Sequence, residues 1–249
     1  MVTRYRAWLD NQGLHDIDPN IVIMDIQESS PMMDVTTAKR GGDGLHVLRR
    51  TRQYLTVAVR FCVYEYDVER RKSAVQKVCA WAAKGGRLTI NDRPEQYLQV
   101  VTEQLPAVNS ALRWQGEMSI IFTAYGVPYW QDEYPEQATG SGQSGSVVIT
   151  PKGDKPEIPL ECKITSTGGT LTRVKIAANG REIAFAGLQL GNGESISIAY
   201  EDGLQRLPVR YRTAESADEI LLYPGRENEV AFEADSAVSV TIKARGAWM

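Results

Sequence analysis

Carboxylates, a glycine motif and two histidines are the residues of this sequence that could do chemistry. Asp132, Glu133 and Glu136 lie close together in a loop rich in tyrosine and proline. Paired carboxylates suit glycoside hydrolysis, but only when their separation in space is right. Sequence spacing does not give that separation. A hydrolase is therefore one hypothesis, and a solvated acidic hinge is the simpler one.

The segment from Gly140 to Gly145 reads GSGQSG and matches the dinucleotide-binding pattern G-x-G-x-x-G. That pattern holds a pyrophosphate only where a strand precedes it and a helix N-terminus follows it. Here the following residues are SVVITP, which is typical of a strand that ends at a proline. We therefore interpret 135–146 as a flexible Gly/Ser linker without a nucleotide site.

Metal binding and nucleophilic catalysis find no support in the residue spacing. His15 and His46 have no Cys, Asp or Glu partner at the spacing of metal ligands. No nucleophile lies in a recognisable elbow or beside a candidate base. The cysteines are widely spaced on apolar stripes, so we expect reduced structural thiols. These are Cys62, Cys79 and Cys162. We predict no catalytic residue, no metal and no cofactor.

Composition describes an ordinary globular protein. A length of 249 residues favours two domains, and 43% hydrophobic with 24% charged residues argues against disorder. The net charge of −3 gives no electrostatic footprint for nucleic acid or for an anionic membrane. The sequence shows neither a signal-peptide pattern nor an apolar run of about 18 residues. We expect synthesis in a cytoplasm and no membrane insertion.

The first half of the sequence mixes strand and helix patterns. Over 55–63 apolar residues recur at every second position, which predicts a two-faced strand. The period then becomes that of a helix near 68–84, with Asp67 as N-cap and Gly85 after its end. Glycines in 27–44 predict a mobile loop. Further strands are predicted over 21–26, 87–90, 97–104 and 117–124.

The second half has the pattern of β structure alone. Short alternating strands recur between turn signals, of which Asn179-Gly180 and Asp202-Gly203 best suit two-residue hairpins. This pattern without a helix predicts a β-sandwich. We therefore predict an α+β, mostly β chain. It consists of an N-terminal β-sheet domain with one packed helix (1–134), the linker (135–146) and a C-terminal β-sandwich (147–249).

Basic runs and tryptophans are candidates for contacts between subunits. The runs at 49–52 (RRTR) and 70–72 (RRK) fit either charges that pair with a neighbouring subunit or plain solvated charges. Trp248 lies at the C-terminus, and exposed aromatic side chains often mark an interface. The candidate interface residues are Arg70, Arg71, Trp81 and Trp130, with packing of the helix as the alternative for Trp81.

Taken in order, these elements resemble the distal tail protein family of bacteriophages with long, non-contractile tails. The resemblance covers most of 50–245 and rests on the succession of features, not on any single motif. The matching features are the strand into a tryptophan-bearing helix (55–81), the Arg87-Leu88 strand, the Asn91-Asp92 turn before Tyr97, the strand ending in Phe122, the Pro128-Tyr129-Trp130 exit, and the segments GNGESISIAYEDG and LLYPGRENEVAF.

The resemblance implies a virion protein without enzymatic activity. Family members are similar in having an N-terminal belt domain that closes into a hexameric ring between the tail tube and the tail-tip hub. Their C-terminal domain is galectin-like and often docks adhesion components. The implied partners are copies of the chain itself, a tail-tube protein, a tail-tip hub protein and a receptor-binding or adhesion protein, with no sequence-specific nucleic acid. The expected function is structural, in the tail tip or baseplate of a phage or prophage.

An alternative function is carbohydrate binding by the C-terminal sandwich, for adhesion to a host surface. An aromatic ring there could stack on the face of a sugar. The available rings are Tyr200, Tyr211 and Tyr223. The hydrolase using Asp132, Glu133 or Glu136 is a third hypothesis.

Overall fold

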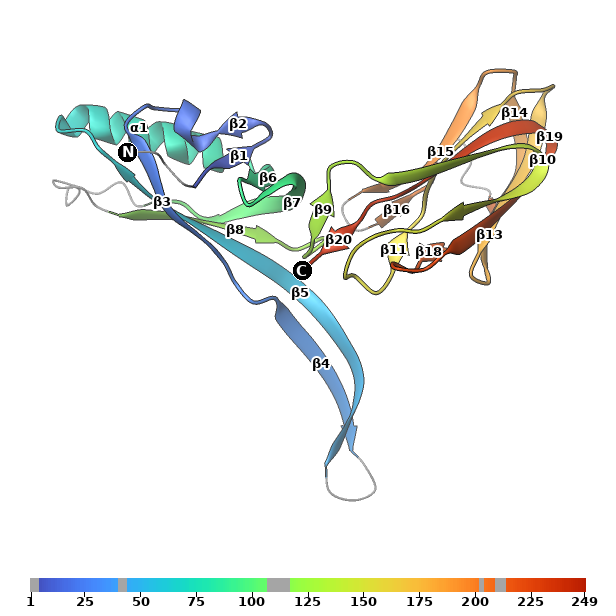
Figure 1. Cartoon of the computed structure of the whole chain (residues 1–249), viewed down its shortest axis with the longest axis horizontal. Helices are drawn as coiled ribbons and strands as arrows, with labels where there is room; N and C mark the ends of the chain where they lie inside the picture. The colour runs from blue at the N-terminus through green and yellow to red at the C-terminus, as the bar shows by residue number, and fades with distance from the viewer. Residues whose placement is uncertain (1–4, 40–43, 107–116, 202–203, 209–213) are drawn as a thin grey trace. The chain divides into compact units, whose positions relative to one another are not determined.

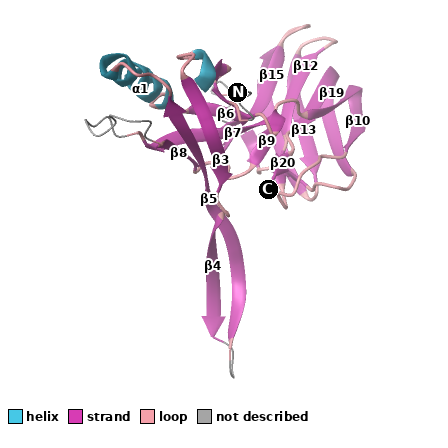
Figure 2. Ribbon diagram, turned by 60° about the vertical axis from the view of Figure 1, so that its left-hand side comes forward, coloured by secondary structure: helices cyan, strands magenta, loops and turns pink. Residues whose placement is uncertain are grey.

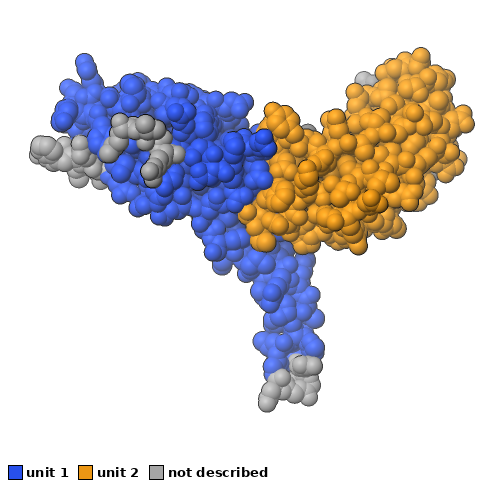
Figure 3. Space-filling model, in the orientation of Figure 1, with its two compact units in different colours: residues 1–130 blue, residues 131–249 orange. Residues whose placement is uncertain are grey.

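The computed structural model describes residues 5–39, 44–106, 117–201, 204–208 and 214–249. The chain divides into two compact units, Met1–Trp130 and Gln131–Met249 (Figure 3), close to the predicted boundary after residue 134. Each unit has a buried apolar core of its own. Among the described residues, the helix in the structure is neither long nor apolar enough to cross a membrane.

The first unit is an antiparallel sheet with an α-helix packed on it (Figures 1 and 2). The strand order is β2-β1-β6-β7-β8-β5-β3, and β4 pairs with the outer part of β5. The elements are β1 (Ala7–Leu9), β2 (Gln12–Gly13), the 3-10 helix η1 (Leu14–Asp16), β3 (Ile21–Glu28), β4 (Met32–Lys39), β5 (Leu45–Val63), α1 (Val68–Ala82), β6 (Gly86–Ile90), β7 (Arg93–Gln104) and β8 (Met118–Ala124).

The core of this unit forms between β5 and α1. The apolar residues that alternate along β5 from Leu55 are buried, as the sequence predicts. Helix α1 turns its own apolar stripe toward them, and the Trp81 ring meets Phe122 of β8 edge-on at 6.0 Å. The Asp67 side chain accepts a hydrogen bond from the Arg70 backbone N–H at 2.9 Å, which confirms the predicted N-cap.

The predicted mobile loop over 27–44 is wrong, because β4 occupies Met32–Lys39. It pairs antiparallel with the first half of β5, which begins at Leu45 and so extends well beyond the predicted strand over 55–63. Nearly all side chains of this hairpin are exposed. Without a buried face there is no clean alternation of apolar and polar residues, so the sequence pattern missed the strand.

The second unit is a β-sandwich built around one core. The strand order of its main sheet is β16-β15-β12-β19-β13-β14-β17, β10 pairs with β19, and β11 pairs with β18. The strands are β10 (Glu136–Ile149), β11 (Ile158–Pro159), β12 (Glu161–Ser166), β13 (Leu171–Ala178), β14 (Arg181–Leu190), β15 (Ser195–Glu201), β16 (Leu204–Arg206), β17 (Ala214–Ala217), β18 (Leu221–Leu222) and β19 (Asn228–Ala244). Two short strands, β9 (Trp130–Asp132) and β20 (Ala247–Trp248), pair with each other outside this sheet.

The predicted Gly/Ser linker over 135–146 is also wrong, because these residues form most of β10. This strand pairs with β19 along its length, with a register shift between Gly142 and Ser144. A Cβ atom at Gly140 would lie 2.6 Å from Val147 Cγ2 and 2.9 Å from Phe232 Cε1. Packing therefore accounts for the glycine at this position, where the sequence pattern indicated flexibility.

The Asn179-Gly180 hairpin between β13 and β14 confirms one predicted turn. Both residues have positive φ, 52° and 76°, as a type I′ turn requires. Ala178 pairs with Arg181 across the turn. The second predicted hairpin, Asp202-Gly203, lies outside the described residues.

Candidate interaction surfaces

A two-stranded arm leaves the sheet of the first unit (Figures 1 and 3). We call β4 and the paired part of β5, Leu45–Tyr54, the arm. Large apolar side chains are exposed on it, including Leu45 at 63% and Leu48 at 65%. Isolated exposed apolar residues need no explanation, but a contiguous group marks an interaction surface.

Cross-strand pairing sorts the arm into two faces, since directly paired residues share a face. One face is apolar and basic: Met33 with Arg52, Val35 with Arg50, Thr37 with Val47, and Lys39 with Leu45. The other face is mainly polar: Asp34 with Thr51, Thr36 with Arg49, and Ala38 with His46. At each of the two register shifts one residue of β5 is skipped, whereas β4 alternates without interruption, so the two faces continue along the arm.

The apolar face of the arm continues the core face of the sheet. Tyr54 pairs with Met32, so these two side chains share one face of the sheet. The residues that follow them, Leu55 in β5 and Met33 in β4, both point to the opposite face. This is the face that α1 covers farther along β5. On the arm no described element covers this side, so its apolar residues remain exposed. The apolar face of the arm therefore resembles the buried face of the sheet, but no second layer of described structure packs on it.

The arm is also basic. Within residues 32–39 and 44–54 there are four Lys or Arg residues (Lys39, Arg49, Arg50, Arg52) and one acidic residue (Asp34), a net charge of 4 − 1 = +3. The Arg52 guanidinium lies over the Tyr129 ring, 4.3 Å from its centroid, and its buried Nη1 atom has no hydrogen-bond partner among the described residues.

Three of the four candidate interface residues, Arg71, Trp81 and Trp130, are buried within the chain, and for Trp81 this favours the alternative of packing beneath its helix. Trp81 donates to the Gln12 carbonyl at 3.0 Å, and Trp130 donates to Glu28 at 2.9 Å. Arg71 is 6% exposed and donates to the Glu65 carbonyl at 2.8 Å. Arg70 alone of the four is exposed. Sequence does not separate an aromatic side chain that fills a core from one that awaits a partner.

The three candidate hydrolase carboxylates lie around the C-terminal segment of the second unit. Asp132 accepts a hydrogen bond from the Trp248 indole at 2.7 Å, and Glu136 forms an ion pair with Lys152. The Arg245 guanidinium donates to the backbone carbonyl of Glu133 at 2.8 Å. These contacts hold strands together. Among the described residues no group of three or more His, Cys, Asp or Glu is placed to bind a metal.

The tyrosines proposed for sugar stacking have cations over their rings. Lys155 Nζ lies 5.7 Å from the Tyr200 ring centroid, and Arg226 lies 3.8 Å from that of Tyr223. Burial raises the pKa of Tyr200, as does the nearby Glu219. Tyr211 lies outside the described residues. A sugar would have to compete with these cations for one face of each ring.

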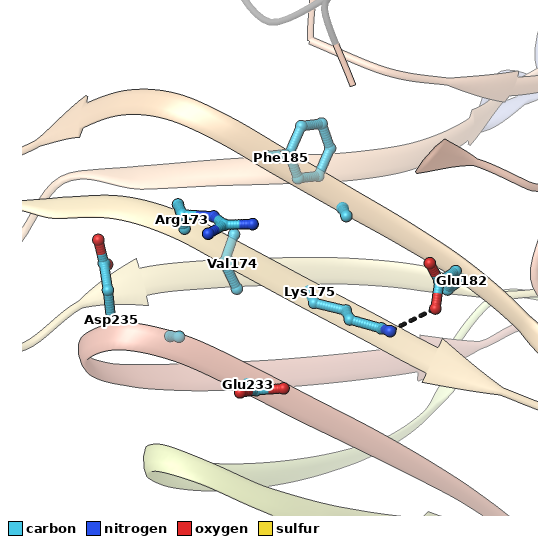
Figure 4. A pocket seen from close by; sticks show the side chains of 9 residues that line it. Arg173, Val174, Lys175, Glu182, Phe185, Glu233 and Asp235 are labelled. Atoms are coloured by element: carbon cyan, nitrogen blue, oxygen red, sulfur yellow. Dashed lines mark ion pairs between the residues drawn. The ribbon is translucent and has the colours of Figure 1, made fainter. Parts of the chain in front are cut away.

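A groove of about 370 Å³ crosses strands β13, β14 and β19 of the second unit (Figure 4). Lys175 and Glu182 form an ion pair at its wall, and Glu233 comes from β19. Burial of Asp235 opposes ionisation, but hydrogen bonds from the Thr172 side chain and from backbone N–H groups, among them that of Arg173, together outweigh it and lower the pKa of this carboxyl. Phe185, the aromatic residue of the lining, is 1% exposed and so offers no ring face.

The fold of the whole chain is that of phage tail-hub proteins. Over 97% of this chain and 98% of the other, it matches the SPP1 Dit (gp 19.1) protein, with a TM-score of 0.69 and 11% identity. That protein is described as a paradigm of the hub adsorption apparatus in phages that infect Gram-positive bacteria.

Two further matches are to the phage P2 baseplate in its activated conformation. The structure with Ca covers 99% of this chain and 98% of that chain; the structure with Sr covers 97% of each. Both have a TM-score of 0.52 and 11% identity. No protein-family model and no curated protein matches the sequence. For the fold, these likenesses confirm the resemblance that the sequence predicts.

Proposed function

We propose that this chain is a structural, non-enzymatic component of a phage or prophage tail tip, and part of the virion. The likeness to SPP1 Dit carries the proposal, because it runs through both units and nearly the full length of both chains. At 11% identity it is a likeness of fold. The assignment of function therefore needs its own test.

In this proposal the first unit closes into a ring, with six copies as the expected number. The uncovered face of the arm supports a ring, since a closed assembly gives every copy a neighbour that covers it. Ring closure also removes the unpaired strand edges that would otherwise invite aggregation. The ring would join the tail-tube protein on one side to the tail-tip hub protein on the other.

The second unit would then be a galectin-like platform that docks a receptor-binding or adhesion protein. The competing function, direct carbohydrate binding, gains little from the geometry because Tyr200 and Tyr223 carry cations on their rings. A glycan array separates the two. Binding that is lost when either tyrosine is replaced by alanine would favour the carbohydrate function.

Mass photometry and negative-stain imaging of the full chain test the ring. We expect closed rings at micromolar concentration, or on mixing with tail-tube and hub proteins of the same phage or prophage. A strict monomer under all these conditions, with no binding to either protein, would contradict the proposal.

A further inference from the structure

The turn between β5 and α1 is a second uncovered surface of the first unit. Its residues Tyr64–Glu69 read YEYDVE. Tyr66 is 92% exposed, and Tyr64 and Val68 are exposed as well. Tyrosine is enriched where proteins bind each other, because its rigid ring contributes a large contact area at small entropic cost.

Hydrogen bonds hold this turn in one conformation. The buried Arg71 guanidinium donates to the backbone carbonyls of Glu65, at 2.8 Å, and of Tyr66, at 3.4 Å. The Asp67 N–H donates to the Glu65 carboxylate at 3.0 Å, and Asp67 in turn caps the helix. A preorganised surface loses little conformational entropy on binding.

The turn has an acidic excess, the opposite of the arm. Its carboxylates are Glu65, Asp67 and Glu69, and among the described residues only Glu69 has a basic side-chain partner, Lys72 at 2.8 Å. Asp18 lies nearby, because Asn20 accepts from the Tyr64 N–H at 2.8 Å and donates its own N–H to the Asp18 carboxylate at 3.0 Å. The exposed Arg70 and the buried Arg71, whose guanidinium donates to this turn, offset part of this charge. With Asp18, Glu65, Asp67 and Glu69 against Arg70, Arg71 and Lys72, the net charge is 3 − 4 = −1, opposite in sign to the +3 of the arm.

The two surfaces lie at opposite ends of the same strand (Figure 2). Strand β5 has 19 residues and spans about 60 Å at the usual rise per residue. A single copy therefore cannot bring its arm onto its own turn. Two different, complementary patches on one chain are what a head-to-tail contact requires, and such contacts generate rings when the rotation closes.

We propose that the arm of one copy docks on the 64–69 turn of the next copy. This inference rests on the proposed ring and names the surface that the arm binds. The apolar residues of the arm pack on Tyr64 and Tyr66. Arg50 approaches the carboxylates of Glu65 and Asp67, and it can also lie over a tyrosine ring.

Removing the exposed aromatic side chain of Tyr66 tests the contact. Tyr66→Ser should raise the concentration needed for half-assembly at least tenfold in mass photometry, while the melting temperature of the monomer stays unchanged. The matched control is Tyr134→Ser, since Tyr134 is 80% exposed but lies in the second unit. This control should assemble like the wild type.

Cross-linking tests the same contact by a different readout. A mixture of the Thr37→Cys and Arg70→Cys variants, whose exposed positions flank the contact and leave Arg50 and Tyr66 in place, should give a covalent dimer with a short bismaleimide, and the double variant should give a ladder of oligomers. Thr37→Cys mixed with Tyr134→Cys should give neither. The wild type, whose Cys62 and Cys162 are buried and Cys79 half-buried, sets the background.

The outcomes separate this docking from the ring itself. Rings that form normally in Tyr66→Ser, without the expected cross-link, would overturn the docking and leave the ring standing. No assembly of the wild type, even with its tail partners, would overturn both. Loss of rings in Tyr66→Ser together with the specific cross-link would support both.

Discussion

At the scale of single residues, Asn228 organises the turn that precedes β19. It is 2% exposed, and its amide accepts from the Tyr223 N–H and donates to the Tyr223 and Arg226 carbonyls, each at 2.9 Å. We expect Asn228→Ala to destabilise the second unit by about 2–3 kcal/mol, because buried polar groups lose their partners. Urea unfolding measures this. Asn192→Ala, at an exposed site, should change stability by less than about 0.5 kcal/mol.

A substitution at Gly140 distinguishes between a packed strand and a flexible linker at this position. In a linker, alanine at this position would be harmless. In β10 its Cβ would press on Val147 and Phe232, so Gly140→Ala should cost about 1–3 kcal/mol. Thermal unfolding distinguishes the two cases, with Ser141→Ala at the exposed neighbour as control. An unchanged midpoint for Gly140→Ala would argue that the strand is not held against the core.

The Cys162 thiol gives a prediction about pH. Burial raises its pKa to about 12, whereas an unfolded cysteine has a pKa near 8.5. The protonated thiol is favoured by the fold, so this contribution to stability is present at neutral pH. It declines as pH rises through about 8.5 toward 12. At pH 8 Cys162 should resist a thiol reagent in the native protein and react after denaturation. Rapid labelling of native Cys162, followed by mass spectrometry, would contradict this.

At the scale of elements, the two faces of the arm should differ in their effect on assembly. Val35 and Val47 lie on the apolar face and are exposed, so changing both to Thr should leave monomer stability within about 0.5 kcal/mol. The same change should weaken assembly, because apolar area is lost from the interface. Size-exclusion chromatography with light scattering measures both species. Thr36→Ser, on the polar face, is the control, and equal effects would contradict an assignment of the interface to one face.

How well sequence predicted each element depended on whether the element buries one face. Alternation along 55–63 and the helical stripe of α1 follow from a core on one side, and both were predicted. The arm has no buried face and β10 is dominated by glycine and serine, so neither gives a periodic signal. The hairpin at Asn179 was predictable because its turn chemistry is local. Contact surfaces were not predictable from sequence, because the burial of Trp81 and Trp130 depends on which elements pack on them.

At the scale of the whole molecule, the two units should behave as separate folding and assembly modules. Each has its own core and lies near the size at which single domains are stable. The arm and the 64–69 turn both belong to the first unit. Residues 1–130 alone should therefore form rings, and residues 131–249 alone should remain a folded monomer. Mass photometry of the two fragments checks the assembly states, and circular dichroism during heating checks that each unfolds cooperatively. Rings formed only by the full chain would show that the second unit contributes to the ring interface, whereas oligomers of 131–249 alone would place a contact there that the arm does not explain.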